Sequence, residues 1–463
     1  MKKVKTLLLI SLALAAVMLF SACGSKTTLN GIDVSKFTIV YPEYATDAEV
    51  RAAEYIRDAI LEKTGIELPI VDDTVEEVKH EIVVGNTERS ITRDARRITR
   101  EEIGFTIASN ETSIALDGDF FLIAGAANYF VENYITGAEF KAEIPASAAL
   151  TPELEDPNNF IMLIGDGMGE YQTRLFEYLP FPEDDADLLD YEDYQFFGYM
   201  LPNIGWSKTD CYNGTTDSAA GGTALATGYK TLKYAIGKDK DLNDVKSLTE
   251  LANEMGKKTA VVSTDEVTGA TPASFSAHAN DRGDEEDILA SQALLAGKTI
   301  ITCDLNDIKV SELEKTVYDI IQELDKGENG FFMMYEEAHI DKHCHDNELE
   351  DTFFALIRFN RIISIVMEYV MYNPDTFVVI TADHETGDLR DIGGKLQYSK
   401  TSHSNADVPI FAYGKGAEYF ADVTMENHEI AKYVAKLMGE ENFGMQYSFT
   451  DPEDEGDPVE SQD

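Results

Sequence analysis

Side chains able to bind metal ions follow the apolar runs of residues 157–445 that are typical of buried strands. They are Asp166, Thr271, Glu336, Asp341, His345, Asp383, His384 and His403. Singly, an aspartate after a strand is usually a helix cap, and a lone histidine is usually an ordinary polar group. In an open α/β sheet, however, ligands bind beyond the carboxyl ends of the strands. Because all of these residues converge on that one edge, we interpret them as a single constellation.

The residue types of this constellation suit two kinds of metal ion. Mixed imidazole and carboxylate ligands are typical of zinc, whereas carboxylates with a hydroxyl are typical of magnesium. The set therefore predicts two zinc sites and one magnesium site. Cys344 lies between Asp341 and His345, but the i, i+4 spacing of these two residues turns Cys344 away from their shared helix face. We therefore do not expect Cys344 to bind a metal ion.

Ser218 has the sequence context of a nucleophile. It stands in Thr216-Asp217-Ser218-Ala219, directly ahead of a predicted helix of small residues. The positive end of a helix dipole favours both an alkoxide and a phosphate oxygen. No histidine lies two or three residues away to act as a base, so metal coordination would have to activate the hydroxyl. The alternative is that Ser218 only caps its helix.

The elements that must position these residues alternate between strands and helices. The apolar runs include Phe160–Ile164, Thr259–Val262, Phe331–Tyr335 and Thr376–Ile380, and the helical stretches include Leu248–Met255 and Thr352–Tyr372. Nearly continuous apolar strands separated by helices predict a mostly parallel sheet covered on both faces. We therefore expect an α/β catalytic domain over residues 157–445.

Residues 37–150 predict a separate, smaller α/β unit. A strand over Phe37–Tyr41 precedes a helix that begins at the capping box Thr46–Glu49. A hairpin and a second helix, Ala124–Tyr134, complete the unit. The prolines and acidic residues of 152–159 are typical of a domain boundary.

The first residues have the pattern of an export signal. Basic residues precede an uncharged apolar run, Leu7–Phe20, which is shorter than the roughly 18 to 20 residues of a membrane-spanning helix. Small residues directly before Cys23 resemble the cleavage site of a bacterial lipoprotein. We therefore expect residues 1–22 to be a lipoprotein signal peptide and residues 23–36 to be a linker. A lipid on Cys23 would anchor the exported protein on the outer face of the bacterial cell membrane, and an ordinary signal peptide that leaves a free Cys23 thiol is the alternative.

The chain is strongly acidic, with 85 acidic residues, 38 basic residues and a formal net charge of −47. Loss of the basic signal would make the mature protein still more acidic. Such a charge disfavours nucleic acid as a partner. The tail, residues 446–463, is dense in acidic residues, and we expect it to be disordered.

Several motifs of the chain are similar to those of alkaline phosphatases. They are Ile164-Gly165-Asp166-Gly167-Met168-Gly169, Thr216-Asp217-Ser218-Ala219, Ala270-Thr271-Pro272, Asp341-Lys342-x-x-His345 and Thr381-Ala382-Asp383-His384. The resemblance spans about residues 158–420 and implies a three-layer αβα sandwich. It also implies hydrolysis of phosphate monoesters through a phosphoserine intermediate, with Ser218 as the nucleophile.

The resemblance further implies which residues bind each ion. One zinc ion would bind Asp341, His345 and His403, and the other would bind Asp166, Asp383, His384 and the Ser218 oxygen. Magnesium would share Asp166 with Thr271 and Glu336. Arg282 stands where the family has its phosphate-binding arginine, whose planar fork can hold two phosphate oxygens.

Gly269 departs from the pattern of the family. Alkaline phosphatases usually have an aspartate or a histidine at this place, two residues before the threonine, where it helps to hold the water shell of the magnesium. We therefore expect magnesium to be weakly held or exchangeable in this chain, with the zinc pair unaffected.

The first unit resembles the α/β domain that precedes the catalytic domain in α-glucuronidases and β-hexosaminidases. The resemblance rests on Ala53-Glu54-Tyr55-Ile56, Thr64-Gly65 and Ile82-Val83-Val84-Gly85-Asn86, none of which is a catalytic motif. We expect a structural spacer, with contact to glycans as the alternative. A homodimer stays open as an alternative to a monomer.

Other functions of the same fold remain as alternatives. A phosphodiesterase of the same superfamily would use a similar zinc pair, but Arg282 and the context of Ser218 favour monoesters. A sulfatase would need its nucleophile in a C-x-P-x-R context, which Ser218 lacks. A non-catalytic surface protein that binds metal or glycans would lack some of the ligands, and none of the zinc positions is missing.

Overall fold

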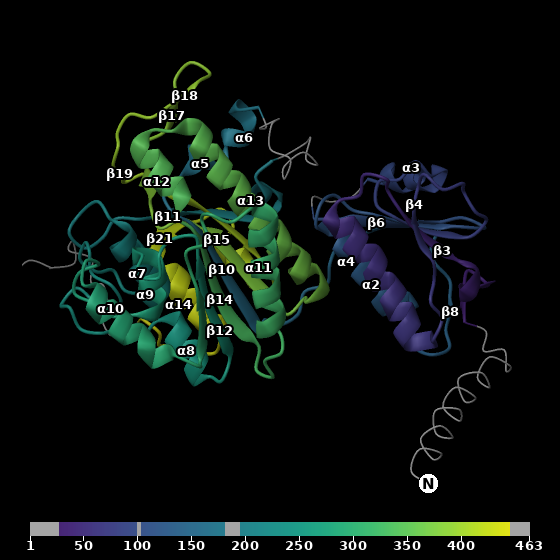
Figure 1. Ribbon diagram of the computed structural model, residues 1–463, viewed down its shortest axis with the longest axis horizontal. Helices are drawn as coiled ribbons and strands as arrows, with labels where there is room; N and C mark the ends of the chain where they lie inside the picture. The colour runs from purple at the N-terminus through teal and green to yellow at the C-terminus, as the bar shows by residue number, and fades with distance from the viewer. Residues whose placement is uncertain (1–26, 100–102, 181–194, 445–463) are drawn as a thin grey trace, which may run out of the picture. The chain divides into compact units, whose positions relative to one another are not determined.

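The computed structural model describes residues 27–99, 103–180 and 195–444, which form two compact units divided between Pro152 and Glu153 (Figure 1). The expected signal peptide, Cys23 and the expected acidic tail at 446–463 lie outside the described residues. Within the described ranges, no helix is both long and apolar enough to cross a membrane.

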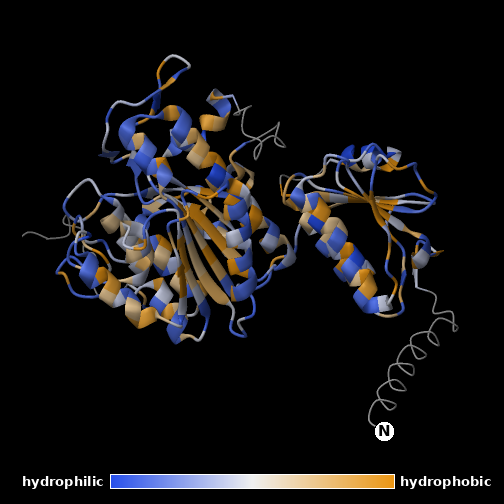
Figure 2. Cartoon of the chain, in the orientation of Figure 1, coloured by the Kyte–Doolittle hydropathy of each residue, from blue (hydrophilic) through white to orange (hydrophobic). Residues whose placement is uncertain are grey.

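The second unit is built on an eight-stranded sheet with the strand order β13-β12-β14-β10-β15-β20-β11-β21. The strands are β10 (Asn159–Gly165), β11 (Asn203–Lys208), β12 (Lys258–Ser263), β13 (Thr299–Thr302), β14 (Phe331–Glu337), β15 (Thr376–Thr381), β20 (Val408–Tyr413) and β21 (Thr424–Glu426). Only the two pairings of β20 are antiparallel among the strand pairs described for this sheet. Figure 2 shows the central strands in apolar colours, as expected for parallel strands buried on both faces.

Helices cover both faces of this sheet. They are α5 (Glu170–Thr173), α6 (Leu175–Tyr178), α7 (Ser218–Thr227), α8 (Leu248–Glu254), α9 (Ala270–Ser276), α10 (Glu285–Gln292), α11 (Val310–Leu324), α12 (His339–Asp346), α13 (Leu349–Tyr372) and α14 (Asn427–Leu437). One core cluster joins Leu225 of α7, Phe275 of α9 and Val434 of α14 to the sheet. On the other face, the ring of Phe359 in α13 stacks on Tyr335 of β14.

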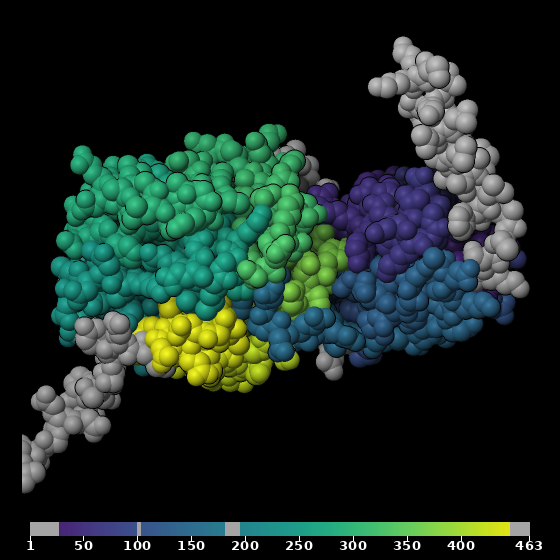
Figure 3. All heavy atoms as spheres, turned by 90° about the horizontal axis from the view of Figure 1, so that it is seen from below, coloured from purple at the N-terminus to yellow at the C-terminus, as the bar shows by residue number. Residues whose placement is uncertain are grey.

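Helix α14 lies on the same face of the sheet as α7 and α9. It contacts both α7 and α8, and in the space-filling view of Figure 3 the yellow C-terminal segment lies beside teal segments of the same unit. The remaining elements of this unit are short. They are the strands β16 (Glu385–Thr386), β17 (Arg390–Asp391), β18 (Leu396–Gln397) and β19 (His403–Ser404) and the 3-10 helices η3 (Phe197–Met200), η4 (Ala293–Leu295) and η5 (Ala417–Phe420).

The first unit has a six-stranded sheet with the order β4-β3-β5-β7-β6-β9. Its elements are β3 (Thr38–Tyr41), α2 (Asp47–Thr64), β4 (Ile70–Asp72), β5 (Glu81–Val84), α3 (Ser90–Arg96), β6 (Phe105–Ser109), β7 (Ile114–Asp117), α4 (Leu122–Tyr134) and β9 (Ser147–Leu150). Helices α2 and α4 pack against each other on the sheet, and α3 lies on its other side (Figure 1). The predicted capping box is present, since the Thr46 side chain accepts from Glu49 N and the Glu49 carboxylate accepts from Thr46 N.

The predicted fold class, an α/β protein with a mostly parallel sheet between helical layers and a smaller α/β unit, is confirmed. One expected boundary is wrong. Residues 28–36, which we expected to belong to a linker, form β1 (Thr28–Leu29), β2 (Ile32–Asp33) and η2 (Val34–Lys36). Strand β1 pairs with β2 and with β8 (Lys141–Ala142), so these residues belong to the first unit.

Candidate active site

The predicted metal-binding residues lie at the carboxyl ends of adjacent strands in the sheet. Asp166 comes directly after β10, Asp383 and His384 follow β15, and Glu336 is the second-last residue of β14. Ile164 of β10 is level with Glu336 in the strand register. Because neighbouring parallel strands end at the same height, their side chains meet at one edge of the sheet.

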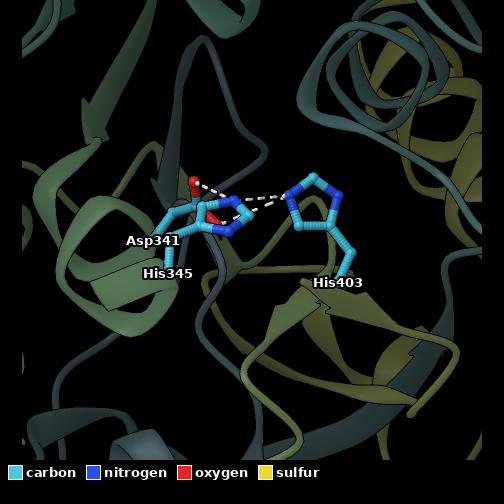
Figure 4. Close-up of side chains that lie close together, drawn as sticks. All are labelled: Asp341, His345 and His403. Atoms are coloured by element: carbon cyan, nitrogen blue, oxygen red, sulfur yellow. Dashed lines mark hydrogen bonds and ion pairs between the residues drawn. The ribbon is translucent and has the colours of Figure 1, made fainter. Parts of the chain in front are cut away.

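Asp341, His345 and His403 form the first cluster (Figure 4). The Nε2 atoms of His345 and His403 are 3.0 Å apart, and they lie 3.4 Å and 3.7 Å from the Asp341 carboxylate oxygens. His345 Nδ1 donates to the Thr401 carbonyl at 2.7 Å, and His403 Nδ1 donates to the Thr216 carbonyl at 2.9 Å. In the neutral rings both Nε2 atoms are therefore unprotonated and face each other, an arrangement that a shared cation would stabilise.

Asp166, Asp383 and His384 form the second cluster, which is buried. His384 Nε2 lies 3.5 Å from Asp166 Oδ1 and 3.4 Å from Asp383 Oδ2. Among the described residues, neither of these two oxygens has a hydrogen-bond partner. Buried carboxylate oxygens without a donor are costly unless a cation neutralises them. The ring of His384 stacks on that of His403 with centroids 3.7 Å apart, so the two clusters are adjacent.

Ser218 opens helix α7 beside the second cluster. Its Oγ lies 3.2 Å from His384 Nε2, and the residue is only 4 % exposed. Asp217 caps the helix by accepting from Ala220 N at 3.2 Å. The serine hydroxyl thus lies at the positive end of a ten-residue helix and beside His384 of the second cluster.

Glu336 lies on β14, next to the strand that precedes Asp166, and Thr271 lies at the start of α9. Thr271 Oγ1 and Glu336 Oε1 are buried and have no hydrogen-bond partner within the part of the chain that is described. The second oxygen of Glu336 accepts a hydrogen bond from Ser263 Oγ. An acidic oxygen and a hydroxyl left without donors are suitable ligands for a hard cation such as magnesium.

The pKa values of the carboxyl groups show how much negative charge is concentrated at this edge. Burial, followed by the charge of Asp341, raises the pKa of Asp383 to about 7. Burial, followed by the charge of Asp265, raises the pKa of Glu336 to about 8. Burial and neighbouring carboxylates also raise the pKa of Asp166 well above its usual range. Without a bound cation, Asp383 and Glu336 would therefore be partly protonated near neutral pH, and a divalent cation bound beside them would favour their ionised forms.

Arg282 is held close to Ser218 by Asp217. Its Nη1 donates to Asp217 Oδ2 at 3.2 Å, and the side chain is 38 % exposed. The other oxygen of Asp217 accepts from Tyr234 N at 3.0 Å, and Arg282 N donates to the Tyr234 carbonyl at 2.8 Å. One carboxylate therefore caps the helix that begins at Ser218 and orients the arginine.

Asp217 and Thr386 are not among the residues that the sequence predicts. Thr386 Oγ1 donates to Asp341 Oδ1 and lies 3.2 Å from His384 Nδ1, so it connects the two clusters. The only feature of the sequence that could have indicated a role for Thr386 is its position two residues after His384. Asp217 has the stronger signal, because an aspartate directly before a helix is a favoured cap.

Cys344 and Gly167 are neighbours of the clusters, and only Cys344 is the subject of a prediction. Cys344 is fully buried and contacts Gln172 and Tyr398 rather than the clusters, and burial raises the pKa of its thiol to about 12. Gly167 approaches Asp341 so closely that a Cβ would lie 2.9 Å from the Asp341 Cα, and its φ is +73°. A side chain at position 167 would collide with Asp341. The close approach of this loop to Asp341 therefore requires glycine.

Comparisons with known proteins identify relatives of the second unit. The sequence model of the family "Alkaline phosphatase" matches residues 157–314 and 306–400, which is more than half of the chain. Alkaline phosphatase 4 of Bacillus subtilis is 27 % identical over 369 residues, which cover 67 % of this chain and 78 % of the relative. Alkaline phosphatase 3 of the same organism is 28 % identical over 60 % of this chain and 70 % of the relative.

The solved structures agree with these relatives. The alkaline phosphatase from the Antarctic bacterium TAB5 is 28 % identical, with a TM-score of 0.53 over 62 % of this chain and 99 % of that chain. A variant of the same enzyme, with Mg bound in its M3 site, matches with a TM-score of 0.52. Sequence, fold and clustered residues agree, and the chain belongs to the alkaline phosphatase family of enzymes.

Proposed function

We propose that the protein hydrolyses phosphate monoesters through a phosphoserine formed on Ser218, with two zinc ions and one magnesium ion as cofactors. The observation that supports this best is the position of Ser218 Oγ, 3.2 Å from His384 Nε2 and at the start of α7. The Ser218 hydroxyl thus lies at the positive end of a helix. It is next to the cluster in which one oxygen each of Asp166 and Asp383 has no hydrogen-bond donor among the described residues.

The donor set fits the expected cofactors. Asp341, His345 and His403 would hold one zinc ion, and Asp166, Asp383, His384 and the Ser218 oxygen would hold the other. Asp166, Thr271 and Glu336 would hold magnesium. Bound zinc would favour the deprotonated form of the Ser218 hydroxyl and of a water molecule, and would stabilise charge on the attacking and leaving oxygens.

The chain itself contributes the nucleophile and the geometry of attack. Ser218 Oγ would form a bond to phosphorus while the bond from phosphorus to the ester oxygen breaks, which releases the alcohol. Water would then attack the phosphoserine from the opposite side, releasing inorganic phosphate and restoring the Ser218 hydroxyl. The first helical turn of α7 would stabilise the serine oxygen in both steps.

Substrate binding is assigned to Arg282. A strongly acidic protein should repel a phosphate dianion, but bound divalent ions and the Arg282 guanidinium would make the pocket locally positive. Charges beyond a Debye length of about 8 Å are screened at physiological salt. The sign of the charge within the pocket therefore determines whether a phosphate dianion is attracted. The hydrogen bond that Arg282 Nη1 donates to Asp217 Oδ2 fixes one nitrogen of the guanidinium, and its other nitrogens could donate to phosphate oxygens.

A comparison of two substrates tests the proposed reaction. An aryl phosphate should be hydrolysed much faster than an aryl phosphodiester, because a diester lacks one of the anionic oxygens that Arg282 and the metal ions would bind. Both rates can be followed by release of the same aryl alcohol. A faster diester reaction would favour the phosphodiesterase alternative, and no turnover of either ester by the metal-loaded protein would favour a non-catalytic role.

The Arg282→Ala substitution is expected to lower kcat/KM for an aryl phosphate by about 10- to 100-fold, since a hydrogen bond to a charged group contributes about 1.5–3 kcal/mol. The loss should appear mainly in KM, with a matching loss of affinity for inorganic phosphate. Arg282→Lys should restore only part of it, because an ammonium cannot bind two oxygens in a plane.

Arg57→Ala is a suitable control for Arg282→Ala. Arg57 lies on α2 in the first unit, where it pairs with Asp58 and is 28 % exposed. Its replacement removes an arginine of similar exposure whose described ion pairs are with Glu54 and Asp58 rather than with residues of the site. Equal effects of the two substitutions would contradict a specific role for Arg282.

A further inference from the structure

Gly269 lies directly before α9, and its backbone does not require a glycine. Its φ of −52° and ψ of 148° are accessible to any residue. The constraint is instead the space around it. A Cβ at this position would lie 2.8 Å from Cγ of Asp265 and still closer to the Asp265 Oδ2. The Asp265 carboxylate thus occupies the volume that a side chain at position 269 would need.

Asp265 is fixed in this volume by an ion pair. Lys342 Nζ donates to Asp265 Oδ1, and the two side chains are 45 % and 18 % exposed. Asp265 N donates to Ser263 Oγ at 2.8 Å, and the same hydroxyl donates to Glu336 Oε2. The turn that carries Asp265 is therefore connected to Glu336 through a single serine.

The pair also lies close to the expected magnesium ligands. Ser263 links Asp265 to Glu336, and the Asp265 carboxylate contacts the space at Gly269, two residues before Thr271. Magnesium keeps several water molecules when proteins bind it, and side chains around those waters fix their orientation. A carboxylate and an ammonium beside Asp166, Thr271 and Glu336 are the groups that could accept from and donate to such waters.

We propose that Asp265, paired with Lys342, is a positioning residue that orients the water shell of the magnesium site formed by Asp166, Thr271 and Glu336. This inference rests on the proposed function. It means that the carboxylate missing at Gly269 is supplied from four residues earlier in the chain. Magnesium is then held as firmly as if position 269 carried an acidic side chain, in place of the weak binding that Gly269 alone would suggest.

Magnesium affinity, measured apart from activity, tests this proposal. The protein is stripped with a chelator, reloaded with zinc, and titrated with Mg²⁺ by calorimetry, with metal content measured after dialysis. Asp265→Ala is expected to weaken magnesium binding by about 10- to 100-fold while zinc content stays unchanged. Asp265→Asn, which keeps the shape and removes the charge, should show a similar loss, and this separates the effect from misfolding.

Two further variants make the test specific. Glu323→Ala removes a carboxylate that pairs with Lys258, at the opposite end of β12 from Ser263, and should leave magnesium binding unchanged. The double substitution Asp265→Ala with Gly269→Asp should recover most of the lost affinity. Removing the Asp265 carboxylate clears the atoms nearest to a Cβ at position 269, and the Glu266 carbonyl oxygen, which would lie 2.9 Å from that Cβ, must also shift slightly.

The outcomes separate this inference from the proposed function. Wild-type magnesium affinity in Asp265→Ala would overturn it, as would simultaneous loss of zinc. Absence of a phosphoserine at Ser218 in protein that holds both metals would overturn the proposed function, yet it would leave the magnesium measurements valid.

Discussion

The Ser218→Ala substitution is expected to lower kcat/KM for an aryl phosphate by at least about 10⁴-fold, because removal of a nucleophile eliminates the covalent route entirely. Ser218 is the only hydroxyl among the described residues for which a contact with His384 Nε2 is shown. The residual rate would come from direct attack of water on the bound ester. Steady-state assays with metal-loaded protein measure the effect.

Thr227→Ala is the matched control for this substitution. Thr227 is the last residue of α7, is fully buried, and its hydroxyl donates to the Thr223 carbonyl at 2.7 Å. Its replacement removes a hydroxyl from the same helix at the end away from the clusters. Activity of Ser218→Ala close to that of Thr227→Ala would show that Ser218 only caps its helix.

Removal of the metal ions is expected to abolish turnover and to make stability depend on pH. Burial raises the pKa of Asp383 to about 7 and that of Glu336 to about 8, from ordinary values of 3.8 and 4.5. A carboxyl with a raised folded-state pKa favours folding below its unfolded pKa, and this contribution is lost as pH rises through the folded value. The metal-free protein should therefore lose stability between about pH 5 and pH 8.

Fluorescence of Trp206 offers a direct measurement of this loss. It is the only tryptophan of the chain and lies in β11, so it reports unfolding of the second unit. The Tm of the metal-free protein should fall by at least about 5 °C between pH 5 and pH 8, whereas metal-loaded protein should change little. Asp383→Asn, which cannot ionise, should reduce the fall. An equal Tm at both pH values in metal-free protein would contradict the expected charge repulsion.

The central part of the fold could be predicted because its strands are apolar throughout. Phe331–Tyr335 and Thr376–Ile380 are buried on both faces, and such runs between helices specify a parallel sheet. The edge strands β13 and β21 are short and partly exposed, so their sequences carry no comparable pattern. The sequence predicts a linker where β1 lies, because a strand of two residues that pairs with a distant strand has no detectable periodicity.

Prediction of the site from the sequence is limited in the same way, because contacts between distant residues leave no local pattern. Asp341, His345 and His384 could be singled out because they follow strands or share a helix face. The role of Asp217 in orienting Arg282 depends on a contact between residues 65 positions apart, and that of Asp265 depends on its carboxylate filling the space beside Gly269. Neither contact can be predicted from residues that are adjacent in the sequence, so both are visible only in the folded structure.

Trapping of the covalent intermediate tests the central claim most directly. Metal-loaded protein is mixed with a radiolabelled aryl phosphate, quenched in acid, digested, and the labelled peptide is sequenced by mass spectrometry. The proposed mechanism predicts stoichiometric label on Ser218 and none in Ser218→Ala. Rapid turnover with no labelled peptide, or with label on another residue, would contradict it.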